Sequence, residues 1–393
     1  MLRSLKWLYH LLVAICAALW FRMPARKLIV VGVTGTDGKT TTTSLIYEIL
    51  KLSGYKVSMI TSVNAVIAGV PYDTGFHVTT PTAWWVQKYL REAVNHGDTH
   101  MVLEVTSHGL AQNRVFGISF AVGVLTNITH EHLDWHRSFD DYVKTKLMLL
   151  KSASAAVLNR DDAVIYAKAV ERLRNKKLVL YAIRRDALIT PKTYPFITKL
   201  PGEFNRYNCL AALAATYALG VPKKKALSAI ARFRGVPGRM EVIVRKPYVV
   251  IVDFAHTPNA LIQALRTVRK LAKKRLIHVF GSAGLRDHSK RPLMGKASSS
   301  YADIIVLTEE DYRTEDVNII MDELTAGIES GKEVHRIVNR QEAIVYAMKI
   351  ARPGDVIMIT GKGHEKSLCR GTTEYPWSDQ EEVRKNLQLL VNT

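Results

Sequence analysis

Residues 28–43 read LIVVGVTGTDGKTTTT, and residues 44–52 read SLIYEILKL. The first apolar run has β-strand character and the last segment has helical spacing, so the stretch predicts a strand, a glycine loop and a helix. Gly35 and Gly38 let backbone N–H groups turn toward phosphate oxygens at the helix N-terminus. Lys39 would neutralise the β- and γ-phosphates, and the Thr40 hydroxyl would bind Mg²⁺. The stretch therefore predicts a nucleotide-binding phosphate loop.

The loop departs from the ordinary pattern at one position. A glycine is usual five residues before Gly38, and Val33 stands there, so the sequence fits the variant G-T-x-G-K-T. An incidental glycine turn before a helix is the alternative. Lysine and threonine nevertheless occupy the positions that phosphate and metal binding require, which favours the phosphate loop.

An acidic residue and a histidine cluster are candidate metal ligands. Residues 101–105, MVLEV, predict a buried strand that ends near Glu104, where a P-loop fold places an acidic Mg²⁺ ligand. Residues 130–136, HEHLDWH, resemble the H-x-H-x-D-H site of metallo-hydrolases, but the last histidine is one residue too far. They could form a dinuclear hydrolase site, lie on the surface, or hold Mg²⁺ beside a nucleotide. The upstream phosphate loop favours the third interpretation.

The composition is that of a globular protein with two or three domains. The chain has 393 residues, of which 48% are hydrophobic and 23% are charged. Its net charge of +20 would attract anionic partners such as nucleotides or an acidic membrane surface. The basic runs at residues 223–225 and 273–275 carry no recognition motif, so no nucleic-acid partner is expected. Three widely spaced cysteines argue against a disulfide framework and favour the cytosol.

The N-terminus differs from the rest of the chain. Residues 5–21 are mostly apolar and would rise about 25 Å as a helix, which makes spanning of the roughly 30 Å hydrocarbon core marginal. Aromatic residues lie near both ends, basic residues flank the segment, and no acidic residue precedes Asp37. These features predict a membrane-associating helix, either interfacial or a short anchor. A helix packed on the core or on a partner is the alternative, and a cleaved signal fits least.

Further motifs extend the pattern from about residue 28 to the C-terminus. In order and spacing they resemble the Mur ligase family, and most closely its MurE type, which adds the third amino acid to the muramyl peptide. The segments that carry the resemblance are GVTGTDGKTTT, HVTTP, LEVTSHGLAQNR, LTNITHEHLDWH, YVKTKLMLL, LNRDD, LPGEFNRYNCLAALA, GVPGRMEVI, VDFAHTPNAL, GSAGLRDHSKRPLMG, TEEDYRTED and ITGKGHE.

Together with the apolar N-terminal segment, the two domains that the resemblance implies predict an α/β protein in three parts. An apolar helix at residues 1–25 would precede a central P-loop ATPase domain with a mostly parallel sheet at 26–236. A Rossmann-like α/β domain would occupy 237–393, with the active site between the two domains. The implied activity is ATP-dependent amide ligation: the acceptor carboxylate becomes an acyl phosphate, which the amine of an amino acid attacks.

The resemblance also implies roles for individual residues. ATP would be bound by Gly35, Thr36, Asp37, Gly38, Lys39, Thr40, Thr41, Asn205, Asn208, Arg239, Asp253 and His256. Mg²⁺ would be bound by Thr40, Glu104, His132 and a carbamylated Lys146, and catalysis would rest on Lys39, Glu104, His132 and Lys146. The muramyl-peptide acceptor would contact Thr79, Thr80, Thr106, Ser107, Gln112 and Arg114. The incoming amino acid would contact Arg286, Arg313, Gly361 and Glu365.

Two departures from the family pattern bear on the substrates. The D-N-P-R motif reads Glu310-Asp311-Tyr312-Arg313, so its arginine is retained and meso-diaminopimelate is favoured over lysine. The phosphate loop begins near the start of the sequence, without the uridine-binding domain that usually precedes it. Together with the apolar helix, this suggests an acceptor that is lipid-linked or presented at the inner face of the cytoplasmic membrane.

Other functions stay open at this point. A polyglutamate-type ligase on the same scaffold is the nearest alternative, and a non-catalytic nucleotide-binding scaffold belongs to a different class. The sequence does not determine the oligomeric state.

Overall fold

The computed structural model describes residues 2–72, 79–129 and 138–391. These residues form two compact units, unit 1 (Met1–Arg234) and unit 2 (Gly235–Thr393), each of which is described by itself. The predicted metal ligand His132 lies outside the described residues.

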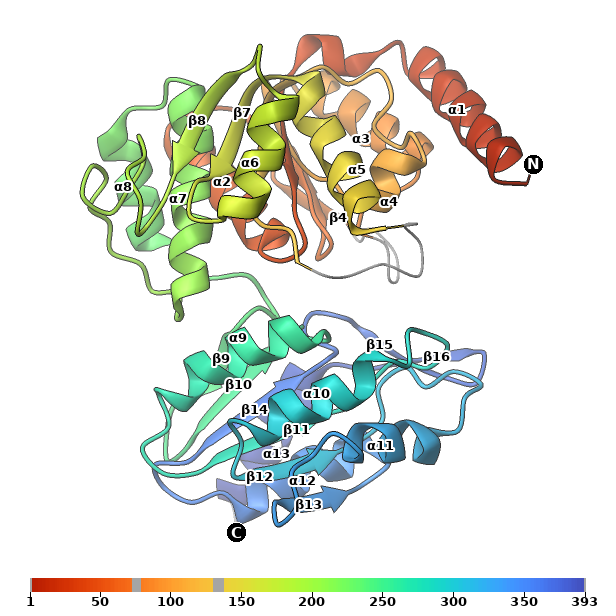
Figure 1. The fold of residues 1–393 in the computed structure, drawn as a ribbon, viewed down its shortest axis with the longest axis vertical. Helices are drawn as coiled ribbons and strands as arrows, with labels where there is room; N and C mark the ends of the chain where they lie inside the picture. The colour runs from red at the N-terminus through yellow and green to blue at the C-terminus, as the bar shows by residue number, and fades with distance from the viewer. Residues whose placement is uncertain (1, 73–78, 130–137, 392–393) are drawn as a thin grey trace. The chain divides into compact units, whose positions relative to one another are not determined.

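Unit 1 is built on one sheet that is parallel except for a hairpin at one edge (Figure 1). In spatial order its strands are β4 (Val70–Tyr72), β3 (Ala65–Ile67), β2 (Val57–Ile60), β5 (His100–Glu104), β1 (Ile29–Thr34), β6 (Phe120–Leu125), β7 (Ala153–Asn159) and β8 (Lys177–Tyr181). Its helices are α1 (Leu2–Trp20), η1 (Pro24–Lys27), α2 (Lys39–Leu52), α3 (Ala83–Asn95), α4 (Ser107–Ala111), α5 (Phe139–Ser152), α6 (Ala163–Arg172), α7 (Glu203–Ala218) and α8 (Lys223–Arg232).

The central strand β1 is covered on both faces, which explains its unbroken apolar sequence. Helices α2 and α7 pack together on one face, and α3 and α5 lie on the other. A Cβ atom at Gly32 would lie 2.7 Å from Leu149 Cδ1 of α5 and 2.8 Å from the Phe120 ring. Glycine in β1 therefore lets α5 approach the strand backbone and fixes the strand beneath the phosphate loop.

Helix α1 joins unit 1 through its C-terminal half. Ala14, Ala17 and Ala18 are buried, whereas residues 6–9 are exposed. The rings of Trp20 and Trp84 lie 5.9 Å apart, which places the end of α1 beside the start of α3. Within the part of the chain that the structure describes, no helix is long and apolar enough to cross a membrane.

Unit 2 has a second sheet, parallel except for its edge strand β9 (Figure 1). In spatial order the strands are β13 (Glu333–Arg336), β12 (Ile304–Leu307), β11 (Leu276–Phe280), β14 (Val356–Thr360), β10 (Val249–Asp253) and β9 (Glu241–Val244), and a hairpin is formed by β15 (Ser367–Arg370) and β16 (Thr373–Pro376). The helices are α9 (Pro258–Arg269), α10 (Lys290–Ser299), α11 (Val317–Thr325), α12 (Arg340–Ile350) and α13 (Asp379–Val391).

Each sheet thus places the loops that follow its parallel strands at one edge, where open α/β sheets bind ligands. In unit 2, α12 and α13 cover one face, and α9, α10 and α11 pack together on the other. The predicted α/β class with mostly parallel sheets is confirmed.

A buried histidine lies in the core of unit 2. His278 of β11 is fully buried, and its ring nitrogens lie 2.8 Å from Ser298 Oγ and 3.0 Å from Thr360 Oγ1. Burial, with a smaller effect of the Arg340 charge, lowers the pKa of His278 to about 3. The folded protein therefore keeps this side chain neutral at a pH where the unfolded chain protonates it.

This difference predicts a loss of stability in acid. The folded pKa lies below the ordinary value of 6.5, so His278 stabilises the fold fully above pH 6.5 and progressively less as the pH falls toward 3. One such histidine contributes a slope of at most about 1.4 kcal/mol per pH unit in the free energy of unfolding. Urea titrations of the full chain from pH 7 to 4 should show this slope reduced in His278→Gln. The exposed control His96→Gln should retain it, and an unchanged slope in His278→Gln would contradict the assignment.

Candidate active site

The phosphate loop connects β1 to α2, and two glycines are required by its contacts. Gly38 has φ 78°, and a Cβ atom there would lie 2.2 Å from Asn208 Oδ1. A Cβ atom at Gly35 would lie 1.8 Å from Thr126 Oγ1. Neither approach is possible with a side chain, so both glycines let the loop lie against its neighbours.

Lys39 begins α2 and folds back over the loop. Its Nζ donates a hydrogen bond to the Thr36 carbonyl at 2.8 Å, so the positive charge lies beside the helix N-terminus. A cation and the N-terminal N–H groups together favour an anion. The structure brings Gly35, Thr36, Gly38 and Lys39 together at the start of α2, and their role in phosphate binding stays a prediction.

Oxygen donors of unit 1 gather beside Lys39. The Thr40 hydroxyl lies 2.9 Å from the Ser62 hydroxyl, and the Ser62 backbone N–H donates to Glu104 Oε2 at 2.9 Å. Glu104 is buried at the end of β5. Hydroxyl and carboxylate oxygens are the donors that Mg²⁺ accepts, so these residues fit the ion. Ser62 was not predicted, because a lone serine in the loop after β2 gives no sequence signal.

Lys146 of α5 contacts the backbone of the phosphate loop. It is buried, its Nζ donates to the Gly35 carbonyl at 2.6 Å, and it lies 4.4 Å from the centre of the Tyr142 ring. The Tyr142 hydroxyl in turn lies 3.1 Å from Thr36 Oγ1. Lys146 therefore lies beside the phosphate loop, and its predicted role as a carbamylated metal ligand stays a prediction.

The loop after β6 fixes Asp37. The Asp37 N–H donates to Asn127 Oδ1 at 2.9 Å, while Asn127 Nδ2 and Thr126 Oγ1 donate to the Asp37 carbonyl at 3.1 and 2.7 Å. Asn127 satisfies the backbone polar groups of the phosphate loop and was not predicted as a functional residue. It belongs to the segment LTNITHEHLDWH, in which only the histidines were considered as candidate ligands.

Two asparagines of α7 lie against the same loop. Asn208 Nδ2 donates to Asn205 Oδ1 at 3.0 Å, and Thr42 donates to Asn208 Oδ1 at 3.4 Å. Both asparagines are buried. Their predicted contact with adenine stays a prediction, since in the structure Asn208 packs on Gly38. Thr41, the remaining residue predicted for ATP in this unit, is buried in the first turn of α2.

The predicted acceptor residues meet at the end of β5. Thr80 Oγ1 accepts from the Thr106 N–H at 3.0 Å and donates to the Glu104 carbonyl at 3.2 Å. Arg114 donates to Gln112 Oε1 at 2.9 Å and also to the Thr80 carbonyl. The Ser107 hydroxyl is buried without a hydrogen-bond partner among the described residues, and Thr79 is half-buried. Thr80 and Thr106, which are predicted to contact the acceptor, therefore adjoin Glu104, the predicted metal ligand.

In unit 2, residues predicted for the nucleotide follow β10. Asp253 Oδ2 accepts from the Met240 N–H at 2.7 Å, which fixes the segment that carries Arg239. The Arg239 guanidinium lies 4.4 Å over the Phe254 ring. Burial, together with the nearby charge of Lys290, lowers the pKa of His256 to about 3, so this imidazole is neutral near pH 7.

The residues predicted for the amino acid are spread over three loops of unit 2. Arg313 donates from Nη1 to the Gly284 carbonyl at 2.8 Å, and Glu365 pairs with the buried Lys362 at 2.6 Å. A Cβ atom at Gly361 would lie 2.5 Å from Glu310 Oε2, a buried oxygen without a hydrogen-bond partner among the described residues. The structure thus brings Gly361 to Glu310, while Arg286 is exposed.

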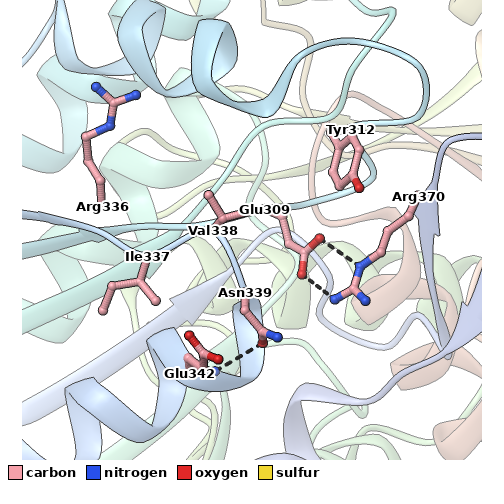
Figure 2. A pocket seen from close by; sticks show the side chains of 8 residues that line it. All are labelled: Glu309, Tyr312, Arg336, Ile337, Val338, Asn339, Glu342 and Arg370. Carbon is pink, nitrogen blue, oxygen red and sulfur yellow. Dashed lines mark hydrogen bonds and ion pairs between the residues drawn. The ribbon is translucent and has the colours of Figure 1, made fainter.

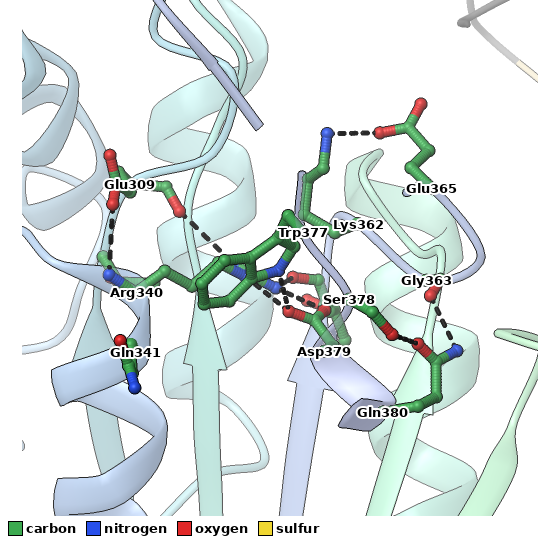
Figure 3. A network of polar contacts seen from close by, with 12 residues as sticks. Glu309, Arg340, Gln341, Lys362, Gly363, Glu365, Trp377, Ser378, Asp379 and Gln380 are labelled. Carbon is green, nitrogen blue, oxygen red and sulfur yellow. Dashed lines mark hydrogen bonds and ion pairs between the residues drawn. The ribbon is translucent and has the colours of Figure 1, made fainter. Parts of the chain in front are cut away.

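A buried ionic network holds two of these loops (Figure 3). Arg340 donates from Nε and Nη2 to the carboxylate of Asp379 at 2.8 Å, and both side chains are fully buried. Arg340 also donates to the carbonyls of Glu309 at 3.2 Å and Thr360 at 2.8 Å. It therefore ties the TEEDYR segment after β12 to the GKGHE segment after β14. Residues 340 and 379 are far apart in sequence, and the pairing was not predicted.

A pocket of about 510 Å³ opens beside the TEEDYR segment (Figure 2). Glu309 and Arg370 form an ion pair of 2.5 Å at its wall. The pocket is lined by Glu309, Tyr312, Arg336, Ile337, Val338, Asn339, Glu342 and Arg370. It lies next to the loop that carries Arg313 and contains charges of both signs.

Comparison with known proteins accounts for this arrangement. The model of the Mur ligase middle domain matches residues 33–216, and that of the Mur ligase glutamate ligase domain matches residues 238–363. The chain belongs to the Mur ligase family. Members of this family are ligases that form an amide bond. The two matched domains fall within units 1 and 2, one in each.

Named relatives of this Mur ligase cover most of the chain. It is 35% identical over 373 residues to the UDP-N-acetylmuramoyl-L-alanyl-D-glutamate–2,6-diaminopimelate ligase of Clostridium botulinum (strain ATCC 19397 / Type A), covering 90% of this chain and 76% of the relative. It is 38% identical over 413 residues to the UDP-N-acetylmuramyl-tripeptide synthetase of Roseiflexus sp. (strain RS-1), covering 95% and 81%.

Solved structures agree in fold. A UDP-N-acetylmuramoyl-L-alanyl-D-glutamate–2,6-diaminopimelate ligase superposes with a TM-score of 0.62 at 31% identity and covers 93% of this chain and 79% of that structure. E. coli FolC in complex with DHPP and ADP gives a TM-score of 0.72 at 18% identity and covers 96% and 92%. The second likeness shows only that the fold is shared.

The Arg340–Asp379 pair predicts a large stability effect. Asp379→Asn leaves a buried guanidinium without its counter-charge and should lower the free energy of unfolding by about 3–5 kcal/mol. Glu381→Gln changes an exposed carboxylate on the same helix and should stay within about 0.5 kcal/mol of the parent. Urea unfolding measures both. Equal stability of the Asp379 variant and the parent would contradict the role given to the network.

Proposed function

We propose that this Mur ligase uses ATP to join the carboxylate of a muramyl-peptide acceptor to the amine of an amino acid, in the synthesis of a peptidoglycan precursor. One observation supports this assignment above the others. Thr80 and Thr106, expected to contact the acceptor, are hydrogen-bonded around Glu104 at the end of β5, beside the phosphate loop. An acceptor carboxylate held there would face the γ-phosphate.

The proposed chemistry is a two-step substitution. A carboxylate oxygen attacks the γ-phosphorus, the bond to the β-phosphate oxygen breaks, and ADP leaves. The amine then attacks the acyl carbon, inorganic phosphate leaves with the bridging oxygen, and the amine loses a proton. An amide, ADP and phosphate result.

Positive charge must be in place before the first step. Two anions about 4 Å apart repel by roughly 4 kcal/mol at an effective dielectric constant of 20. Lys39 lies where it would lower this repulsion, and the N–H groups at the start of α2 point the same way. Mg²⁺, when bound, would supply further charge stabilisation, with Thr40, Glu104, His132 and a carbamylated Lys146 as its proposed ligands. The Ser62 N–H donates to Glu104 Oε2 at 2.9 Å and so restrains the orientation of this carboxylate.

For the amino acid, we propose meso-diaminopimelate rather than lysine. Arg313, retained from the D-N-P-R motif, would bind the distal carboxylate, because a guanidinium pairs with a carboxylate in two parallel hydrogen bonds. Gly361 and Glu365 would contact the far end of the same substrate, and Arg286 could approach from its exposed loop. Several relatives named as 2,6-diaminopimelate ligases support this choice.

ATP and the amino acid are cytoplasmic metabolites in this proposal, so the enzyme would act in the cytoplasm. Helix α1, which is largely apolar and exposed at residues 6–9, would attach it to the inner face of the cytoplasmic membrane.

The direct test is ADP release by the purified full chain with Mg²⁺, a muramyl dipeptide acceptor and either diaminopimelate or lysine, with products identified by mass. A new tripeptide that contains diaminopimelate is expected. ATP turnover with glutamate alone as amino acid would instead indicate a polyglutamate-type ligase, and nucleotide binding without any product would indicate a scaffold.

Lys39→Ala is expected to lower ADP release by about 10³-fold, because it removes a charge that faces the transferred phosphoryl group. Lys51→Ala, an exposed change in the last turn of the same helix, is the matched control and should keep the parent rate. Initial rates at saturating ATP measure both. A Lys39 variant as fast as the parent would contradict the assignment of the loop.

Arg313→Ala is expected to raise the KM for diaminopimelate by about 10- to 100-fold, the effect of losing a charge-assisted pair, with a smaller effect on kcat. The KM for ATP should not change. Arg384→Ala, an exposed arginine of unit 2, is the control. If the KM for diaminopimelate stayed the same in Arg313→Ala, this arginine would not bind the amino acid.

A further inference from the structure

Exposed apolar side chains lie along α1 and in the first turn of α3 in unit 1. Six of them, which we call the α1–α3 surface, are between 40% and 71% exposed: Trp7, Leu12, Leu19, Trp20, Trp84 and Trp85. Four of the six are tryptophans. Water-facing apolar groups on this scale are unusual on a monomeric protein and mark a site of interaction.

The two helices present this surface together. The Trp84 ring lies 5.9 Å from Trp20 and 5.1 Å from Phe21, and Arg91 of α3 donates from Nε to the Phe21 carbonyl at 2.8 Å. The end of α1 is thereby fixed to α3, while its N-terminal half extends outward with residues 6–9 exposed (Figure 1). The α1–α3 surface therefore has residues on both helices, which contact each other at Trp20 and Trp84.

The charges beside this surface are nearly all positive. The sequence has five basic and no acidic residues before Asp37, and of these Lys6, Arg22, Arg26 and Lys27 are exposed. Lys88 of α3 lies 4.7 Å from the Trp85 ring. A second copy of the chain would bring this positive charge against itself. Anionic headgroups would be attracted to it, while tryptophans favour the boundary between headgroups and acyl chains.

We propose that the α1–α3 surface binds the headgroup region of an anionic lipid membrane through both helices. Trp7 and Leu12 of α1, with Trp84 and Trp85 of α3, enter the boundary region, and the lysine and arginine side chains contact phosphate groups. The contact at α3 goes beyond an attachment through α1 alone, because it fixes the orientation of unit 1 on the membrane.

That orientation would place Thr79 and Thr80, which are proposed to contact the acceptor, near the lipid surface. Helix α3 begins at Ala83 with Thr82 as N-cap, so Trp84 and Trp85 lie in its first turn, four and five residues after Thr80. One helical turn rises only about 5.4 Å. The acceptor class that fits this placement is a muramyl peptide carried on a membrane lipid. This second step rests on the proposed function, whereas lipid binding itself does not.

Lipid binding is tested by cosedimentation of the full chain with vesicles of phosphatidylglycerol and phosphatidylcholine, or of phosphatidylcholine alone. The parent should bind the anionic vesicles, and more weakly as salt is raised. The double variants Trp7→Ser/Leu12→Ser and Trp84→Ser/Trp85→Ser should each bind at least about 10-fold more weakly. The control Val164→Ser/Ile197→Ser removes two exposed apolar side chains elsewhere in unit 1 and should bind like the parent.

Several outcomes would overturn the proposal. Parent-like binding of the Trp84/Trp85 variant would remove α3 from the contact, and equal binding to neutral vesicles would remove the anionic lipid. A dimer that forms through these residues and excludes vesicles would assign the surface to a second copy of the chain. Because variants can misfold, the unmodified protein is also tested with brominated lipids, which should quench its tryptophan fluorescence, and absence of quenching would likewise count against the proposal.

The acceptor class is tested by comparing a lipid-linked muramyl dipeptide in anionic vesicles with the soluble UDP-linked form. Trp84→Ser/Trp85→Ser should lower kcat/KM at least about 10-fold for the lipid-linked acceptor and leave that for the UDP-linked acceptor unchanged. Equal loss with both, or use of the UDP-linked form alone, would overturn the lipid-linked assignment. No product with either acceptor, with vesicle binding intact, would refute the proposed function and leave the lipid contact standing.

Discussion

Close approach of the phosphate loop to its neighbours is the constraint on which unit 1 depends. Gly35 and Gly38 lie where a Cβ atom would overlap Thr126 and Asn208. With glycine at both positions, the loops after β1 and β6 and the helix α7 can meet at one edge of the sheet. Glu104 lies at the same edge, because β5 pairs with β1 and places Glu104 opposite Val33. The phosphate loop and this carboxylate are therefore neighbours.

Unit 2 depends on a different constraint, because charged side chains such as Arg340 and Asp379 are buried beside its loops. Burying Arg340 costs desolvation energy that only a fully paired guanidinium offsets, and it has Asp379 and two carbonyls as partners. These contacts fix the segments that carry Arg313 and Gly361. The proposed function thus divides two tasks: unit 1 would position the phosphate and acceptor groups, and unit 2 would position the amino acid.

The sequence predicted those features that a local pattern or a motif specifies. The strand, loop and helix of residues 28–52 follow from apolar periodicity and glycine placement, and Glu104 follows from a strand that ends in a carboxylate. Ser62, Asn127 and the Arg340–Asp379 pair were missed, because each gains its role from a partner distant in the chain. Glu365, which is proposed to contact the substrate, forms an ion pair with the buried Lys362. The sequence pattern did not predict this pair.

The central claim is that the acceptor carboxylate is activated as an acyl phosphate at the site formed by the phosphate loop and Glu104. Its most direct test is a single turnover with a muramyl dipeptide whose reacting carboxylate carries two ¹⁸O atoms, followed by mass analysis of the inorganic phosphate. Attack of this carboxylate on the γ-phosphorus predicts phosphate with one ¹⁸O atom for each amide formed. Amide formation with unlabelled phosphate would contradict the account.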